Sequence, residues 1–195
     1  MSLLPLKVEA AIFYAAFLAW LFITFVVEPW FIGRGGRKER DTSEDGGSAL
    51  LIFGGTFAAI VVAFSLGGAE VTPLPEWTFF AGVAVMFVGV AVREWAVATL
   101  KGFFLFRVGV LKEHRVVDTG PYRLVRHPGY SGAMLTFAGI GLATESLVGV
   151  LIMVLICSVV YGYRIRVEEK ALQKDLGEEY QAYMRRTKRL VPYVL

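Results

Sequence analysis

Two short groups of charged residues, far apart in the chain, have the chemistry to bind a small zwitterionic ligand. Arg126 and His127 directly precede Pro128, and Glu168 directly precedes Glu169. Proline is favoured in the first turn of a helix, so Arg126 and His127 fall at a predicted helix N-terminus, where free N–H groups and the helix dipole attract anions. These two residues would bind the anionic part of a ligand and the two glutamates its cationic part. Anchoring to lipid phosphate is the alternative role for the arginine.

The two glutamates lie on or beside the apolar face of a predicted helix. The residues of this face recur at helical spacing: Ile165, Leu172, Leu176, Tyr180 and Tyr183. At about 100° per residue, Glu169 falls inside this face and Glu168 at its edge. A carboxylate buried there is costly unless it meets a cation, either on a ligand or on Arg126, Arg164 or Arg166.

The chain that carries these residues has the composition of an integral membrane protein. Of its 195 residues, 56% are hydrophobic and 19% are charged, whereas soluble domains average about 45–50% and about 25%. The mean hydropathy is +0.59, and the apolar residues form blocks long enough to cross a bilayer. One cysteine and two histidines argue against a disulfide framework and a structural zinc site. We therefore expect a membrane partner, no metal and no nucleic acid.

Five apolar blocks predict an all-α, polytopic membrane fold in which residues 1–195 form a single membrane domain. The predicted transmembrane helices cover residues 10–32, 48–69, 78–98, 128–144 and 146–163. The last two are short and nearly contiguous, so they predict a tight antiparallel hairpin. Residues 164–195 predict an additional C-terminal helix outside the membrane, which Gly177 would interrupt.

Lysine and arginine predict the orientation of the helices, because cytoplasmic loops of membrane proteins carry an excess of both. Eighteen of the 20 lie in residues 33–47, 99–127 and 164–195, whereas Lys7 lies on the other side and Arg93 within the third helix. The N-terminus is therefore predicted outside and the C-terminus in the cytoplasm. Segments 99–127 and 164–195 would form a ligand pocket at the cytoplasmic face. That membrane would be the inner membrane of a prokaryotic cell or the endoplasmic reticulum of a eukaryotic one.

Two features inside the predicted helices have a structural interpretation. Arg93 and Glu94 in the third helix and Glu28 in the first are expected to snorkel or to pair with one another. The fourth helix carries small residues at three- and four-residue spacing, which we expect to let the fifth helix approach closely: Gly129, Gly132, Thr136, Gly139 and Ala143.

Taken in order, the residues of the C-terminal half resemble the isoprenylcysteine carboxyl methyltransferase family and its phospholipid and small-molecule methyltransferase relatives. The matching stretches are HRVVDTGPY at 114–122, RHPGY at 126–130, Arg164, Glu168-Glu169, Leu172, LGEEY at 176–180, Tyr183, Arg186 and Pro192. The first three predicted helices match only as apolar helices. No catalytic triad, P-loop or dinucleotide-binding motif is present.

The resemblance implies an integral membrane enzyme that binds S-adenosylmethionine in a cytoplasmic pocket covered by the C-terminal segment. It places the cofactor contacts on His114, Tyr122, His127, Tyr130, Glu168 and Glu169. It places the arginines that bind the acceptor and act in catalysis at Arg126 and Arg186. We add Arg189, because the tail carries three arginines close together and the sequence does not choose among them.

The resemblance leaves the methyl acceptor open, and a carboxylate is the favoured one. A carboxylate is already ionised at neutral pH and needs only a cationic clamp, which Arg126 and Arg186 would supply. The acceptor would be lipophilic or small, as in the isoprenylcysteine reaction. A phospholipid amine or a thiol would instead have to lose a proton, and Glu169 or His127 would then be the candidate base.

Two alternatives belong to other functional classes. Sterol reductases of a related membrane fold have a C-terminal sequence pattern similar to that of residues 176–193, and they use NADPH. A non-catalytic membrane scaffold is the second alternative. It would make the same arginines and glutamates structural partners of each other.

Overall fold

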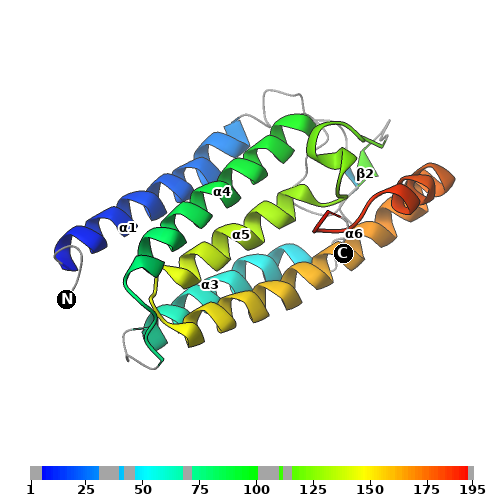
Figure 1. The fold of residues 1–195 in the computed structure, drawn as a ribbon. Coiled ribbons are helices and arrows are strands. Elements are labelled where there is room, and N and C mark those ends of the chain that lie inside the picture. The colour runs from blue at the N-terminus through cyan, green and yellow to red at the C-terminus, as the bar shows by residue number, and fades with distance from the viewer. Residues whose placement is uncertain are drawn as a thin grey trace.

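Five long helices lie side by side along the molecule (Figure 1) in the part of the chain that the structure describes. The structure is a computed structural model, and it describes residues 6–30, 40–41, 47–67, 72–100, 110–111 and 116–192. The helices are α1 (Leu6–Phe22), α3 (Ser48–Gly67), α4 (Trp77–Leu100), α5 (Pro128–Leu142) and α6 (Leu147–Arg186). A π-helical segment, η1 (Ile23–Val27), continues α1, and a 3₁₀ turn, η3 (Gly120–Arg123), precedes α5.

One small element departs from the predicted all-helical fold. The two-residue strands β1 (Arg40–Asp41) and β2 (Val110–Leu111) pair antiparallel, with Arg40 opposite Leu111 and Asp41 opposite Val110. Strands of two residues are too short to show the alternating pattern from which a strand is predicted. The pair joins the two predicted cytoplasmic segments that follow α1 and α4.

Four of the five helices, among the residues described, are long and apolar enough to cross a membrane. They are the helical stretches Val8–Trp30, Ser48–Ser65, Trp77–Leu100 and Leu147–Arg186. The fourth predicted span corresponds to α5, which has 15 residues. At about 1.5 Å per residue α5 is about 22 Å long, whereas the hydrocarbon core is about 30 Å thick. The predicted count of five spans is therefore not confirmed by helix length.

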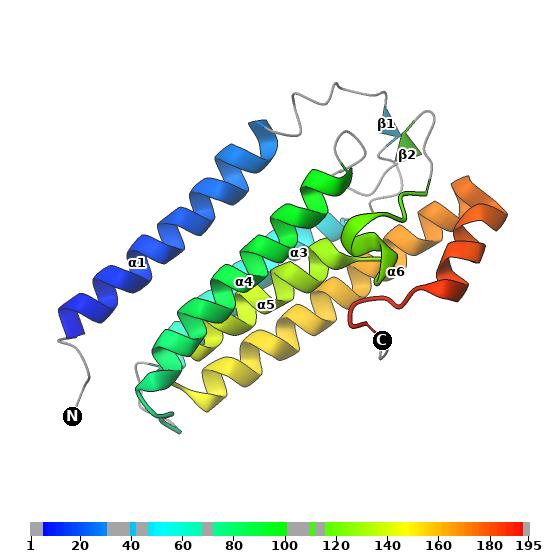
Figure 2. The ribbon, with the colours of Figure 1, turned by 45° about the horizontal axis from the view of Figure 1, so that its top comes forward.

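The last predicted span continues without a break into the C-terminal helix. The apolar first part of α6 and the charged residues that follow it, including Glu168 and Glu169, form one helix as far as Gly177, where the chain kinks. Gly177 interrupts it as predicted, with φ 52° and ψ −124°. Figure 2 shows the chain turning back beyond this kink toward the start of α5.

The hairpin predicted between the last two helices is present, but the small residues of α5 face a different helix. α5 ends at Leu142, and α6 begins at Leu147 after a turn in which Glu145 has φ 52°. An added Cβ at Gly132 would lie 2.5 Å from the backbone nitrogen of Arg93 on α4, and one at Gly82 of α4 would lie 2.5 Å from that of Ala143. The close approach is therefore between α5 and α4. The prediction of α6 as the partner was wrong, because residue spacing identifies a helix face made of small residues but does not show which helix packs against it.

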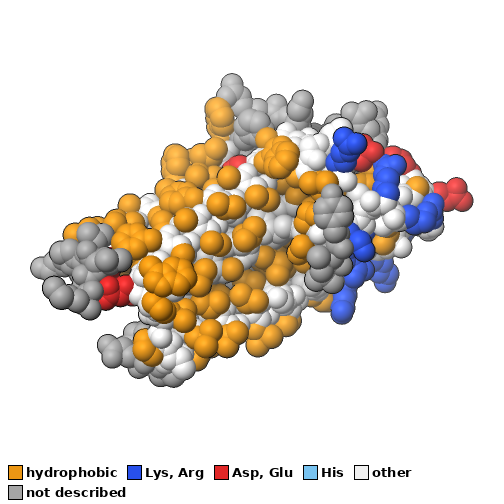
Figure 3. Space-filling view, in the orientation of Figure 1, with side chains coloured by type: hydrophobic (Ala, Val, Ile, Leu, Met, Phe, Trp, Pro, Cys, Tyr) orange, Lys and Arg blue, Asp and Glu red, His pale blue; other side chains and the backbone are white. Residues whose placement is uncertain are grey.

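Charge is distributed as expected for a membrane protein. On the face shown in Figure 3, hydrophobic side chains are spread along the length of the bundle, and lysine and arginine gather at one end, around the C-terminal part of α6. Inside the bundle, Arg93 of α4 binds Glu28 in two places, with Nε 2.6 Å from Oε1 and Nη2 2.8 Å from Oε2. The carboxylate of Glu28 is fully buried. The predicted pairing of Arg93 with Glu28 is therefore confirmed.

Candidate functional site

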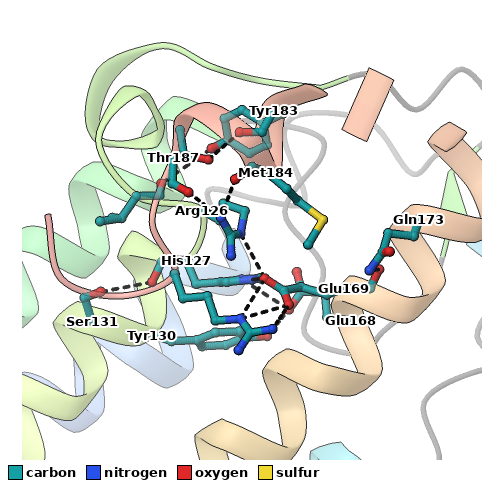
Figure 4. A network of polar contacts seen from close by, with 12 residues as sticks. Arg126, His127, Tyr130, Ser131, Glu168, Glu169, Gln173, Tyr183, Met184 and Thr187 are labelled. Atoms are coloured by element: carbon teal, nitrogen blue, oxygen red, sulfur yellow. Dashed lines mark hydrogen bonds and ion pairs between the residues drawn. The ribbon is translucent and has the colours of Figure 1, made fainter. Parts of the chain in front are cut away.

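The two charged groups identified from the sequence meet at one end of the helix bundle (Figure 4). Arg126, in the segment before α5, donates from Nε to Oε1 of Glu169 on α6 over 2.9 Å. Both side chains are almost fully buried. The two groups are in direct contact, with no space between this guanidinium and this carboxylate. We call Arg126, His127, Tyr130, Glu168, Glu169 and Arg189 together the charged cluster.

Backbone hydrogen bonds fix the segment before α5 against the tail that follows α6. The amide of Arg126 donates to the carbonyl of Lys188 over 2.7 Å, and that of His127 to the carbonyl of Arg189 over 3.0 Å. His127 is the N-cap residue of α5, and Pro128 occupies the first turn, as the sequence predicted. Because these backbone groups are paired with the tail, the helix entrance and the tail form one rigid unit.

Arg126 also holds the end of α6. Its Nη1 donates to the carbonyl oxygen of Met184 over 3.2 Å and to that of Thr187. Nearby, the Tyr183 hydroxyl donates to the carbonyl of Tyr122 over 2.6 Å. One guanidinium thus binds a carboxylate on α6 and carbonyls beyond the Gly177 kink, so the return of the chain after the kink builds the site.

Arg189 is the tail arginine that reaches the cluster. Its Nη2 lies 2.9 Å from Oε2 of Glu169, and its Nε donates to the same oxygen over 3.1 Å. The side chain of Arg189 is 51% exposed. The carboxylate of Glu169 therefore has one buried cationic partner, Arg126, and one that is open to solvent.

His127 and Tyr130 form an aromatic layer against the second carboxylate. Their rings stack with centroids 5.6 Å apart, and the Tyr130 hydroxyl donates to Oε2 of Glu168 over 2.6 Å. His127 lies between the two acids, with Nδ1 4.0 Å from Glu168 Oε2 and Nε2 3.4 Å from Glu169 Oε1. That Nε2 atom is buried and forms no hydrogen bond with the described residues, but it lies within ion-pair distance of the Glu169 carboxylate.

The pKa of the Glu169 carboxyl is set by two opposing effects. Burial by itself raises this pKa, but His127, Arg189 and Arg126 stabilise the charged form and lower it to about 2. Glu169 lies in the charged half of α6, outside the apolar part that would cross a membrane. Its carboxylate therefore remains ionised at any physiological pH. In η3, burial raises the pKa of the Tyr122 phenol, which keeps that hydroxyl neutral.

Three predicted site residues lie away from the charged cluster or cannot be placed. Arg186 pairs with Asp118 at the surface, with Nη2 2.6 Å from Oδ2 and both side chains at least half exposed. Tyr122 is buried and contributes its backbone carbonyl to Tyr183. His114 lies outside the described residues.

Arg164 belongs to the site although the sequence reasoning did not name it as a ligand contact. It is buried, and its Nε donates to the Tyr130 hydroxyl over 3.0 Å while its Nη1 donates to Ser48 Oγ on α3 over 2.6 Å. Arg164 precedes Glu168 by four residues, which places both on one face of α6. That spacing was a usable signal, whereas nothing in the sequence indicated Ser48.

A largely apolar cavity of about 310 Å³ adjoins the charged cluster inside the bundle. Helices α1, α3, α5 and α6 supply most of its wall, with Arg93 from α4. Tyr130 and Arg164 line the cavity and also belong to the hydrogen-bonded network that includes Glu168. The site therefore combines a charged part at the end of the bundle with an apolar part within it. Among the residues described, no group of three histidine, cysteine or acidic side chains is positioned to hold a metal ion.

Comparison with known proteins gives a consistent family match. Residues 82–174 match the model of the isoprenylcysteine carboxyl methyltransferase (ICMT) family. A probable protein-S-isoprenylcysteine O-methyltransferase of Oryza sativa subsp. indica is 28% identical over 125 residues, which cover 62% of this chain and 65% of that protein. The cobalt-zinc-cadmium resistance protein CzcN of Cupriavidus metallidurans is 32% identical over 125 residues, covering 64% and 52%. The matched region is less than two thirds of the length of either relative.

A solved structure shares the overall fold. The eukaryotic intramembrane Ras methyltransferase ICMT superposes with a TM-score of 0.56 over 98% of this chain and 88% of that chain, at 18% sequence identity. The likeness therefore extends through α1 and α3, which lie before the part matched by the family model.

Proposed function

Because the chain belongs to the isoprenylcysteine carboxyl methyltransferase family, we propose that it transfers a methyl group from S-adenosylmethionine to the carboxylate of a lipophilic acceptor. The observation that carries this proposal is the continuity of the site. A cluster of paired arginines and glutamates at the end of the bundle adjoins an apolar cavity through Tyr130 and Arg164. Such a site suits a charged cofactor and an acceptor with a charged head and an apolar tail.

The residues of the charged cluster fit S-adenosylmethionine in charge and in hydrogen-bonding capacity. Glu168, whose side chain is 30% exposed, and Glu169 would accept hydrogen bonds from its ammonium group. Arg189, half exposed, would bind its carboxylate, and the imidazole of His127, which lies between the two glutamates, would be a further polar contact. When bound, the cofactor supplies an electrophilic methyl group on a cationic sulfur. Because Arg126 and Arg189 already pair with Glu169, the partly exposed carboxylate of Glu168 would provide most of the attraction for a cationic ligand.

The state of Glu169 favours a carboxylate acceptor over an amine or a thiol. An amine or thiol must lose its proton to become a good nucleophile, and an efficient base has a pKa near the working pH. The pKa of Glu169 is lowered to about 2, so this residue is a poor base at neutral pH. His127 is the remaining candidate base for those acceptors. A carboxylate needs no base and would be held by arginine.

The chain's own residues would act mainly by positioning and by excluding water. Tyr130 is fixed by Glu168 on one side and Arg164 on the other, so its ring forms a rigid boundary between the charged cluster and the cavity. The apolar lining beyond it, which includes Phe137 and Ile52, keeps water from the acceptor. An enzyme that holds the two reacting atoms about 3–3.5 Å apart in such a site gains a large part of its rate enhancement over the bimolecular reaction in water.

The proposal includes a membrane topology. Five membrane helices with the N-terminus outside and the C-terminus in the cytoplasm would put the charged cluster at the cytoplasmic face, where the excess of lysine and arginine predicts it. The short α5, packed closely against α4, would reach only part of the way through the bilayer. The membrane would be the inner membrane in a prokaryote or the endoplasmic reticulum in a eukaryote.

Methylation by the purified protein tests the proposal. The protein in detergent is incubated with radiolabelled S-adenosylmethionine and, separately, farnesylcysteine, phosphatidylethanolamine or a long-chain thiol. We expect label on farnesylcysteine as a base-labile methyl ester. Label only on the amine or the thiol would contradict the carboxylate assignment.

A matched pair of variants tests the site. Arg189→Gln removes the half-exposed partner of Glu169, and Arg185→Gln makes the same change at an exposed position of α6. We expect weaker cofactor binding only for the first. Equal cofactor affinity in the two variants would contradict the assignment of Arg189.

Two further measurements separate the other functional classes. NADPH affinity without S-adenosylmethionine affinity would favour a reductase over a methyltransferase. A non-catalytic scaffold would show neither affinity, and Glu169→Ala would then change only its stability.

A further inference from the structure

A group of acidic side chains lies at the end of the bundle opposite the charged cluster. Glu145 belongs to the turn that follows α5, whereas Arg126 precedes α5, so the length of this helix separates the two ends. Glu9 lies in the first turn of α1, and Glu76 directly precedes α4. We call Glu9, Glu76 and Glu145 the acidic group. The proposed methyl transfer uses none of these three residues.

Packing between helices brings Glu9 to the same end as Glu145. Phe13 lies one turn after Glu9 on α1, and its ring packs on that of Phe64 of α3 with centroids 5.2 Å apart. The backbone carbonyl of the residue before Phe64 would lie 3.5 Å from a Cβ added at Gly149, in the first turn of α6. Because α6 follows the turn that carries Glu145, the first turn of α1 and this turn belong to the same end of the bundle.

The carboxylates of the acidic group are near enough to act on one another. The amide of Leu74, two residues before Glu76, donates to the carbonyl of Glu145 over 2.7 Å. Glu145 lies in the turn between α5 and α6, outside the long apolar helices. Burial, together with the negative charges of Glu9 and Glu76, raises the pKa of the Glu145 carboxyl. Like charges held in this way disfavour ionisation unless a positive charge lies among them.

Two of these carboxylates have a buried oxygen atom without a partner. Glu9 is only 6% exposed, and its Oε1 is buried and makes no hydrogen bond with the described residues. The same holds for Oε1 of Glu145, although that side chain as a whole is partly exposed. Folded proteins rarely leave buried polar atoms unsatisfied. Two such atoms on carboxylates that feel each other's charge indicate a site for a bound cation.

The neighbouring elements supply little positive charge of their own. Residues 48–92 and 128–163, which include α3, most of α4, α5 and the apolar part of α6, contain no lysine or arginine. Lys7 is the single basic residue among the first 33. Helices α3 and α5 both end here, and the C-terminal ends of helix dipoles are negative. The electrostatic field at this end of the bundle therefore favours a cation.

The donor atoms select a hard divalent cation. Carboxylate oxygens are the preferred ligands of Ca²⁺ and Mg²⁺, and two negative charges balance one divalent ion. No group of three acidic, histidine or cysteine side chains among the described residues is positioned to hold a metal ion. Such an ion would therefore have two protein carboxylates, and backbone carbonyls and water would complete its coordination. The partial exposure of Glu145 gives a hydrated ion access from solvent.

We propose that Glu9 of α1 and Glu145 of the α5–α6 turn together bind one Ca²⁺ or Mg²⁺ ion at the end of the bundle opposite the charged cluster. The ion holds the first turn of α1 against the helical hairpin. This site goes beyond the proposed function and does not depend on it, because no residue of the charged cluster takes part.

Ion binding to the purified protein in detergent tests the inference. The chelator-treated protein is titrated with CaCl₂ and, separately, with MgCl₂ in a calorimeter at neutral pH. Its thermal midpoint is measured with each salt, with NaCl of equal ionic strength, and with chelator alone. Glu9→Gln and Glu145→Gln each remove one carboxylate but keep the size of the side chain. Glu178→Gln is the matched control, because it makes the same change at an exposed position of α6.

We expect one ion per chain from at least one of the two salts, with a dissociation constant of about 0.1–1 mM, the range of weak carboxylate sites. At about 10 mM this ion should raise the thermal midpoint by at least about 3 °C relative to NaCl. Glu9→Gln and Glu145→Gln should each weaken ion binding at least tenfold, and Glu178→Gln less than twofold. With chelator alone, Glu9→Gln should be at least as stable as the native protein, because the variant lacks an unpartnered buried charge.

The absence of binding of both ions at about 10 mM, well above the expected dissociation constant, would overturn the inference. An equal rise of the thermal midpoint in NaCl would overturn it too, because screening of the acidic group would then be the cause. Ion binding that persists unchanged in both Glu9→Gln and Glu145→Gln would show an adventitious ion only. A Glu9→Gln variant that is less stable than the native protein in chelator would also contradict the proposal, because Glu9 would then have a structural role without the ion.

Discussion

Replacing Glu169 by glutamine gives the most quantitative test of the charged cluster. The substitution keeps the size of the side chain but removes the charge that faces Arg126, Arg189 and His127. The pKa of this carboxyl falls from its ordinary 4.5 to about 2 in the folded protein. Since each pKa unit corresponds to about 1.4 kcal/mol, ionised Glu169 contributes about 3 kcal/mol to the free energy of unfolding at neutral pH.

The sign of the pH dependence follows from the lowered pKa. Such a group stabilises the fold fully above pH about 4.5, and its contribution is lost as the pH falls toward 2. We expect Glu169→Gln to be less stable than the native protein by about 3 kcal/mol at neutral pH and by about 2 kcal/mol near pH 3.5. The two proteins should thus become more alike on acidification.

Unfolding in detergent micelles, followed by tryptophan fluorescence at both pH values, measures this difference. Glu178→Gln is the matched control, because it makes the same change at an exposed position of α6. A Glu169→Gln variant as stable as this control at neutral pH would refute the reasoning. A difference that did not shrink in acid would refute it as well, because the stabilisation would then not come from the ionised carboxylate.

Three further predictions concern packing, the aromatic layer and the tail. Gly82→Ala should lower the free energy of unfolding by about 1–3 kcal/mol, because its Cβ would lie 2.5 Å from the backbone of α5. Gly162→Ala, where no atom lies within 4 Å of the new Cβ, should change it by no more than about 1 kcal/mol. Tyr130→Phe removes the hydroxyl that joins a carboxylate to a guanidinium, and S-adenosylmethionine affinity, measured by equilibrium binding, should fall about tenfold. Arg186→Ala should change the free energy of unfolding by less than about 0.5 kcal/mol, because its ion pair is exposed. A loss of methyl transfer in this variant would therefore indicate a role of Arg186 in the reaction. A clearly altered thermal midpoint would contradict the expectation that the ion pair adds little stability.

The sequence by itself determined the features that depend on local pattern. Apolar blocks located the helices within a few residues, and Pro128 and Gly177 marked a helix start and a kink. Helical periodicity put Glu169 on a buried face, where the structure has it. These features depend on residues within a few turns of one another, so their spacing along the chain is sufficient.

Only the tertiary structure decided which faces and which charges meet. The small face of α5 packs on α4, and Arg189, not Arg186, reaches Glu169. Ser48, far away in the chain, pairs with Arg164. The spacing of residues along one helix shows that one face consists of small residues, or that a charged residue is buried and needs a partner. The identity of the partner depends on how separate helices cross and on where the chain returns after Gly177, and local pattern does not contain that information.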